Sequence, residues 1–235
     1  MEIRSRVMDQ PRLIYYNDAH HFHAKRIEPP TSRHLLNWPV DEVLGTGVDL
    51  LVMGLGYGDV YFHRSKIGRV VGQGKKKWES YIDWRIMRVV EVSSDLGTDQ
   101  LQAVIERGRE TGLRVFPSLK LQDSAQPGSE RCGHLKEENG AAVCIGDAGR
   151  AKWCYDFANM DVQQDKLAMI TELLDDYGAD GLELDFCFDN FYFKQKDISD
   201  RIPYMNQFVA RIRKLATEIG TRQGRKIPLM ARVHL

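Results

Sequence analysis

Short apolar runs alternate along the chain with stretches whose apolar residues recur at helical spacing. The runs lie at residues 12–18, 49–55, 114–119, 181–188 and 227–233, and they are rich in β-branched, leucine and aromatic residues, which is typical of strands. The run at 49–55 (DLLVMGL) is apolar almost throughout, as expected of a parallel strand covered on both faces. The pattern therefore predicts five strands of a parallel sheet.

Helices are predicted between these strands. A short one begins at Pro39, and longer ones occupy residues 98–112, 161–178 and 203–220. Strand–helix alternation at this spacing indicates either an open doubly wound sheet or a (β/α)8 barrel. Because no glycine-rich nucleotide-binding motif follows any of the strands, we favour the α/β barrel and expect no cofactor.

Two segments, residues 60–94 and 122–159, are too long to be ordinary connections. The first carries the basic tract Lys75-Lys76-Lys77 and shows no clean period of 2 or 3.6, and the second is rich in glycine and charge. We expect both to pass over the mouth of the barrel, where the second would shape a substrate cleft.

A complete barrel of this class has eight strands, whereas this sequence stops in its fifth. We therefore expect a (β/α)8 TIM barrel truncated after strand 5, with residues 1–235 forming one incomplete domain. Such a sheet would have two open strand edges, which predicts self-association through those edges.

Composition narrows the range of partners. The 33 Lys and Arg residues balance 33 Asp and Glu residues, so no net charge attracts the chain to nucleic acid or to an anionic membrane. No apolar run is long enough to span a bilayer, and residues 1–12 lack the apolar core of a secretory signal, which predicts a cytoplasmic protein unless a longer precursor is exported. The four cysteines are expected to be reduced, with a Cys132–Cys144 bridge as the alternative in an exported protein.

Two carboxylates in the fourth predicted strand are the strongest functional signal. Alternation in this strand places Glu183 and Asp185 on one face and the neighbouring leucines on the other. The leucines would contact the helices, so the carboxylates would point into the barrel, with Asp185 at the C-terminal mouth, where barrel enzymes hold their active sites. We predict Asp185 and Glu183 as catalytic residues. The structural alternative is a buried ion pair of Glu183 with Arg232 or Lys120.

Polar residues follow the other predicted strands at the same end of the sheet. Such side chains can exchange hydrogen bonds with the hydroxyl groups of a sugar. We predict these residues to bind substrate: Asn17, Asp18, Tyr57, Asp59, Lys120, Asp123, Arg232 and His234.

Three motifs mark the second half of the chain: Tyr155-Asp156-Phe157-Ala158-Asn159, the run that ends in Asp185-Phe186, and Phe191-Tyr192-Phe193. Together they resemble bacterial glycosyl-hydrolase-like barrel proteins of the family-10-like group. The resemblance implies a (β/α)8 fold, action on a polysaccharide or glycoside, and strand-4 carboxylates in the active site. These relatives tend to close strand 3 with an Arg and an Asn-Asp pair, so Lys120 and Gln122 depart from the pattern while Asp123 keeps it.

Other barrel groups bear on the role of Asp185. The Asp-Gly-x-Glu-x-Asp run at 180–185 is similar to that of chitinase-like barrels, but the position of their catalytic acid is occupied by Cys187. The amylase and α-galactosidase groups have an aspartate nucleophile at the end of strand 4, which Asp185 matches. No second carboxylate lies on strand 5, so we expect it in the missing strands. Its separation from Asp185 would decide between a retaining mechanism, at about 5 Å, and an inverting one, at about 6.5 to 9.5 Å.

Two other functions stay open as alternatives. His21 and His23 follow strand 1 in a pattern that resembles metal-dependent amidohydrolases, with His234 as a further ligand, but the strand-4 lysine of that group is absent. We therefore expect solvated loop histidines and no metal site. A noncatalytic carbohydrate-binding barrel would keep the fold without the chemistry. The sequence as a whole favours a glycoside hydrolase that degrades a carbohydrate.

Overall fold

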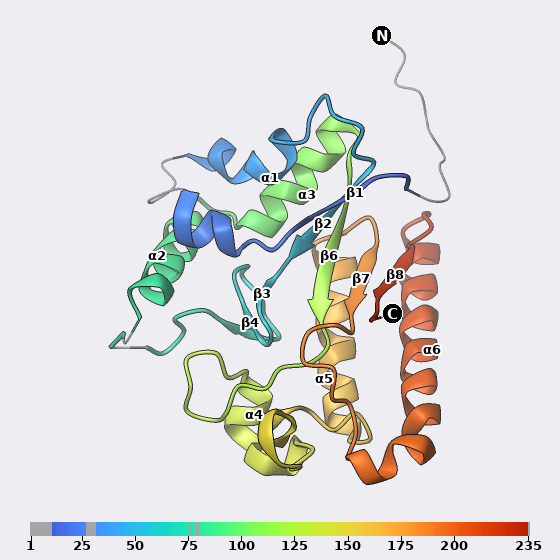
Figure 1. Cartoon of the computed structure of the whole chain (residues 1–235). Coiled ribbons are helices and arrows are strands. Elements are labelled where there is room, and N and C mark those ends of the chain that lie inside the picture. The colour runs from blue at the N-terminus through green and yellow to red at the C-terminus, as the bar shows by residue number, and fades with distance from the viewer. Residues whose placement is uncertain (1–10, 27–31, 76, 79, 235) are drawn as a thin grey trace.

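A computed structural model describes residues 11–26, 32–75, 77–78 and 80–234. At its centre is a five-stranded sheet in the order β1-β2-β6-β7-β8, in which neighbouring strands are parallel (Figure 1). The strands are β1 Ile14–Asn17, β2 Leu50–Gly54, β6 Arg114–Lys120, β7 Leu182–Asp185 and β8 Leu229–Arg232. The five predicted strands are confirmed, with ends that differ from the prediction by three residues at most.

The sheet curls into a half-barrel. Tyr16 in β1 and Arg232 in β8 belong to its two edge strands, yet the Arg232 guanidinium lies 4.2 Å from the centre of the Tyr16 ring. The apolar residues Leu50, Val52 and Phe116 fill the concave face between them. The sheet is therefore curved strongly enough for its edges to meet through side chains.

Helices alternate with the strands and pack on the convex face. They are α1 Trp38–Asp41, α2 Tyr81–Asp95, α3 Gln100–Thr111, α5 Met160–Thr171, which a π turn at Glu172–Asp176 extends, and α6 Ile198–Arg222. The convex core joins strand and helix residues, among them Leu51, Met53, Val104, Leu119, Ile170, Leu182, Leu184 and Phe208. The prediction that the leucines of the fourth strand face the helices is confirmed.

The starts of three helices differ from the sequence prediction. The cap of α3 is Asp99, not Thr98, because the Asp99 carboxylate accepts a hydrogen bond from the backbone N–H of Gln102 at 2.9 Å. Asn159, not Asp161, caps α5. Helix α6 begins at Ile198, which leaves Pro203 inside the helix rather than at its first position.

Helix α2 lies almost entirely within the segment 60–94, for which the sequence predicts no regular period. Ile86, Val89, Val90 and Ser93 form its buried stripe at helical spacing. The exposed aromatic residues of its first turn obscured this stripe, since they do not lie on the buried face. The prediction of an irregular segment is wrong for this part.

Both long segments extend past the C-terminal ends of β2 and β6, as predicted (Figure 1). The first forms a small sheet of β3 Gly56–Tyr57, β4 Val60–Tyr61 and β5 Arg69–Val70. The second contains α4 His134–Asn139 and the 3-10 turns Gly140–Val143 and Gly149–Trp153. Further short turns lie at Phe22–Arg26, Arg33–Asn37 and Gln195–Asp197.

A close approach of backbones at the mouth requires glycine at position 54. A Cβ atom on Gly54 would lie 2.8 Å from the carbonyl oxygen of Asp18 and 3.0 Å from its Cα. Because these are backbone atoms, they cannot swing aside as the end of a side chain can. Gly54 therefore allows the loop after β1 to close over the end of β2.

The four cysteines are free thiols, which agrees with the reduced state expected from sequence, and Cys132 and Cys144 are not bridged. Burial raises the pKa of Cys132 and of Cys154 to about 12, so these thiols are unreactive at neutral pH. No helix in the described ranges is long and apolar enough to cross a bilayer.

Phe208 provides a test of the packing between α6 and the sheet. Its side chain is 0% exposed and lies edge-to-face with Phe157. We expect Phe208→Ala to lower the free energy of unfolding by about 3 to 5 kcal/mol, because the substitution leaves a cavity. Tyr204→Ala, at a site 39% exposed in the same helix, is the control and should change it by less than about 1 kcal/mol. Urea unfolding measures both; equal losses would contradict the described packing.

Candidate functional site

The register of three neighbouring strands brings polar side chains together at the C-terminal end of the sheet. Lys120 in β6 pairs with Asp185 in β7, and Asp185 pairs with Arg232 in β8. One layer below, Ser118 pairs with Glu183. Since alternate residues of a strand share a face, all of these residues point toward the concave side.

Asp185 is held in one orientation from two sides. It is 2% exposed, and its Oδ2 accepts a hydrogen bond from Arg232 Nη2 at 2.6 Å. Its Oδ1 accepts a hydrogen bond from the backbone N–H of Cys187 at 2.8 Å. The Asp185 carboxylate is therefore fixed, because one of its oxygens is bound by Arg232 of β8 and the other by the backbone of the turn after β7.

Glu183 lies beneath Asp185 and shares the same cation. Its Oε1 is 3.4 Å from Arg232 Nε. Burial raises the pKa of Glu183, an effect that Arg232 partly opposes and Asp185 reinforces. The ion pair considered as a structural role for Glu183 is therefore present, with Arg232 rather than Lys120 as its partner.

Lys120 lies beside this pair, and among the residues that the structure describes no carboxylate forms an ion pair with it. Its Nζ donates a hydrogen bond to the Gly56 carbonyl at 3.0 Å and lies 4.4 Å from the centre of the Phe188 ring. Burial lowers the pKa of Lys120, while the charges of Asp185 and Asp18 oppose that shift. Lys120 therefore adds positive charge to the rim next to Asp185.

Two residues of the concave face were missed by the sequence analysis. Tyr16 stacks against Arg232, and Ser118 lies in the layer of Glu183. Alternation along the strands could have identified both residues. Ser118 lies two positions before Lys120 in β6 and so shares its face, and Tyr16 in β1 faces the same side of the sheet as Arg232. The prediction selected Asn17, at the strand end, in place of Tyr16.

Two predicted substrate-binding residues instead support helices. The Asn17 amide donates a hydrogen bond to Glu42 Oε1 at 3.1 Å, at the end of α1. The Tyr57 hydroxyl donates a hydrogen bond to Asp83 of α2, and the Arg131 guanidinium lies 4.1 Å from the centre of its ring. These contacts hold the polar groups of both residues against other parts of the protein.

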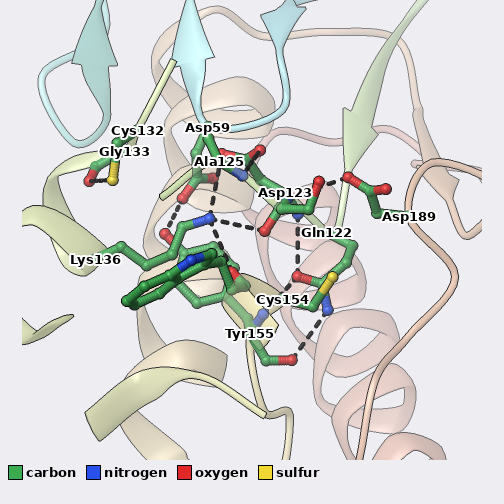
Figure 2. Close-up of polar contacts among 12 residues, drawn as sticks. Asp59, Gln122, Asp123, Ala125, Cys132, Gly133, Lys136, Cys154, Tyr155 and Asp189 are labelled. Atoms are coloured by element: carbon green, nitrogen blue, oxygen red, sulfur yellow. Dashed lines mark hydrogen bonds and ion pairs between the residues drawn. The ribbon is translucent and has the colours of Figure 1, made fainter. Parts of the chain in front are cut away.

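Asp59 and Asp123 belong to a buried cluster that includes Lys136 and Tyr155 of the second long segment (Figure 2). Asp59 pairs with Lys166 and accepts a hydrogen bond from the Tyr155 hydroxyl. Burial opposes the charge of Asp59, but the Lys166 ammonium outweighs it and lowers the pKa of this carboxyl. Lys136 donates a hydrogen bond to the Asp123 carbonyl at 2.7 Å and lies 3.4 Å from Asp123 Oδ2.

This cluster serves to hold the mouth together. The Gln122 amide oxygen accepts hydrogen bonds from the backbone N–H groups of Asp123 and Tyr155, at 3.0 and 2.6 Å, and its nitrogen donates to the carbonyls of Tyr155 and Phe191. Asp59 is buried, and its two carboxylate oxygens contact Lys166 and the Tyr155 hydroxyl.

The two remaining predicted residues lie at the rim. Asp18 Oδ1 is 3.1 Å from His21 Nδ1; the side chain of His21 is 63% exposed and that of Asp18 is 40% exposed. His234 Nε2 is 3.3 Å from the Cys187 carbonyl and is also exposed. Asp18 and His234 are therefore free to contact a ligand at the mouth, together with Lys120 and Arg232.

The two histidines of the metal-site alternative differ in their surroundings. His23 is buried between the rings of Phe22 and Phe62, and its Nδ1 lies 2.9 Å from the Ala19 carbonyl. His21 is exposed beside Asp18. No group of three or more potential metal-binding residues occurs in the described ranges.

Comparison with known proteins gives a likeness in fold. No protein family and no curated protein matches this sequence. The solved structures that it resembles include the maltogenic α-amylase AmyB from Thermotoga neapolitana, with a TM-score of 0.53 and 10% identity over 95% of this chain and 46% of the amylase. Dispersin B follows with a TM-score of 0.50 and 14% identity over 92% of this chain and 57% of that protein.

The catalytic module of the glycogen-degrading pneumococcal virulence factor SpuA has a TM-score of 0.50 and 10% identity over 94% of this chain and 31% of the module. These proteins are glycoside hydrolases built on TIM barrels. The described sheet therefore has the fold of one side of such a barrel, and the chain spans about half or less of the length of AmyB and SpuA.

The buried His23 predicts a loss of stability in acid. Burial lowers the pKa of His23 to about 4, whereas the unfolded chain binds this proton near pH 6.5. The free energy of unfolding therefore falls by about 3 kcal/mol in total as the pH drops from 6.5 to 4. Above pH 7 His23 makes no contribution to the pH dependence.

We expect His23→Gln to remove this part of the pH dependence, measured as the free energy of unfolding by urea at pH 7 and pH 4.5. His34→Gln, at an exposed site, is the control and should keep the wild-type dependence. An unchanged acid slope in His23→Gln would show that His23 takes up its proton equally in both states.

Proposed function

We propose that this chain forms one side of the active site of a glycoside hydrolase that acts on a polysaccharide or glycoside. The observation that carries the proposal is the placement of Asp185 at the C-terminal end of β7, on the concave face, with both oxygens oriented by Arg232 and the Cys187 backbone. Active sites of barrel enzymes lie at this end. The motif resemblance to the family-10-like group supports the same class.

Asp185 is assigned as nucleophile or electrostatic stabiliser. Glycosidic bond cleavage passes through a transition state with positive charge on the sugar ring, which a fixed carboxylate stabilises or attacks. Arg232 holds this carboxylate in place through a hydrogen bond to its Oδ2. Glu183 is the second candidate, since burial raises its pKa and favours its protonated form.

Asp18, Lys120, Arg232 and His234 are assigned to substrate binding, because they surround Asp185 at the mouth and offer donors and acceptors to sugar hydroxyls. A noncatalytic carbohydrate-binding barrel is the second candidate function. One observation favours this second function: Arg232 forms an ion pair with Asp185 Oδ2, so this oxygen already has a partner within the protein.

The proposal is tested by release of reducing ends from a panel of glycans that includes glycogen and maltotriose. We expect Asp185→Asn to lower the rate by at least about a hundredfold, because the charge that stabilises the transition state is lost. Asp95→Asn, an exposed aspartate at the end of α2, is the matched control and should keep the wild-type rate.

Full activity in Asp185→Asn would refute the catalytic assignment. If the wild-type protein binds a glycan of the panel at the concave face but releases no sugar, the carbohydrate-binding function replaces the hydrolase.

A further inference from the structure

A cavity of about 630 Å³ lies on the convex side of β7, outside the candidate active site. The loop after β7 and the first two turns of α6 form one wall, and the 3-10 turn Gly149–Trp153 forms the other. These segments come together at the lower right in Figure 1, near the beginning of α6. The hydrogen bonds that the structure describes for the Asp185 side chain come from Arg232 and from the backbone of Cys187 and Phe188, which do not line this cavity.

The walls of the cavity are held in place by backbone contacts. The Tyr192 carbonyl accepts a hydrogen bond from the Phe157 N–H at 3.0 Å, and the Phe191 carbonyl accepts one from the Gln122 amide. Asp147 Oδ2 accepts a hydrogen bond from the Gln195 N–H at 2.8 Å and so connects the two walls. The cavity is therefore preformed.

The lining combines aromatic and aliphatic surface with three side-chain amides and one carboxylate, that of Asp147. Four aromatic residues line it: Phe186, Phe191, Tyr192 and Phe193. The side-chain amides of Asn190, Gln195 and Asn206 stand at the same cavity, and none of them has a hydrogen-bond partner among the residues that the structure describes. The lining contains no lysine or arginine.

This combination fits a neutral pyranose ring better than other ligands. A pyranose has an apolar C–H face that packs on an aromatic ring, and hydroxyl groups at its edge that need both donors and acceptors, which amides supply. An anionic ligand would find no cation. A purely hydrocarbon ligand would leave the three amides unused.

We propose that this cavity is an accessory binding pocket for a neutral pyranose unit, separate from the face that carries Asp185. The choice of a sugar as ligand rests in part on the proposed function. The pocket lies on the same end of the sheet as Asp185, so a polymeric glycan bound there would be kept near the candidate active site.

The test uses Met205, which lines the cavity, as a reporter. The protein is labelled at its methionine methyl groups, and NMR spectra are recorded during titration with methyl α-glucoside, methyl β-galactoside and N-acetylglucosamine. We expect the Met205 resonance to shift and saturate at millimolar concentration of at least one sugar, while that of Met87 in the buried part of α2 stays unchanged.

Phe191→Ala removes a ring that is 41% exposed, so the fold does not depend on it. This substitution should raise the dissociation constant for the sugar by about tenfold. Tyr81→Ala, an exposed aromatic residue of α2, is the matched control and should leave it unchanged.

The outcomes separate this proposal from the proposed function. A Met205 shift that persists in Asp185→Asn supports an accessory pocket, whether or not the protein cleaves glycans. The proposal is overturned if none of the sugars shifts Met205, if toluene shifts it while the sugars do not, or if the shift disappears in Asp185→Asn.

Discussion

The ion pairs of Arg232 with two carboxylates are the interactions on which the concave face depends. Glu183 and Asp185 occupy successive inward positions of β7, where two negative charges would repel each other and lose their hydration. Arg232 lies within 3.4 Å of Glu183 Oε1 and 2.6 Å of Asp185 Oδ2, so one cation compensates both. The parallel pairing of β7 with β8 provides this contact, and Tyr16 from the opposite edge of the sheet closes over the guanidinium.

A second set of charges supports the mouth in a different way. Asp59 and Lys166 are buried together, with Tyr155 as a shared partner, and Lys136 binds the backbone of Asp123. These contacts connect the loop after β3 to α5 and to the second long segment. This cluster therefore connects the loops around the candidate site.

The strands and the inward position of the two carboxylates could be predicted because both follow from a period of two in sequence. Leu182 and Leu184 alternate with Glu183 and Asp185, and that pattern survives in the structure. The individual substrate contacts could not be predicted in the same way. Position at a strand end does not tell whether a side chain such as Asn17 or Tyr57 turns toward a helix, since the partners Glu42 and Asp83 are distant in sequence. Helix α2 was missed because its exposed aromatic residues masked the buried stripe.

The central claim is that the carboxylate of Asp185 faces the reacting bond of a glycan. A crystal structure of Asp185→Asn soaked with the glycan that the wild-type protein cleaves tests it most directly. The account predicts a sugar ring on the concave face, with its anomeric carbon or glycosidic oxygen within about 3 to 3.5 Å of the side chain at position 185. A glycan bound only elsewhere, with position 185 out of contact, would contradict it.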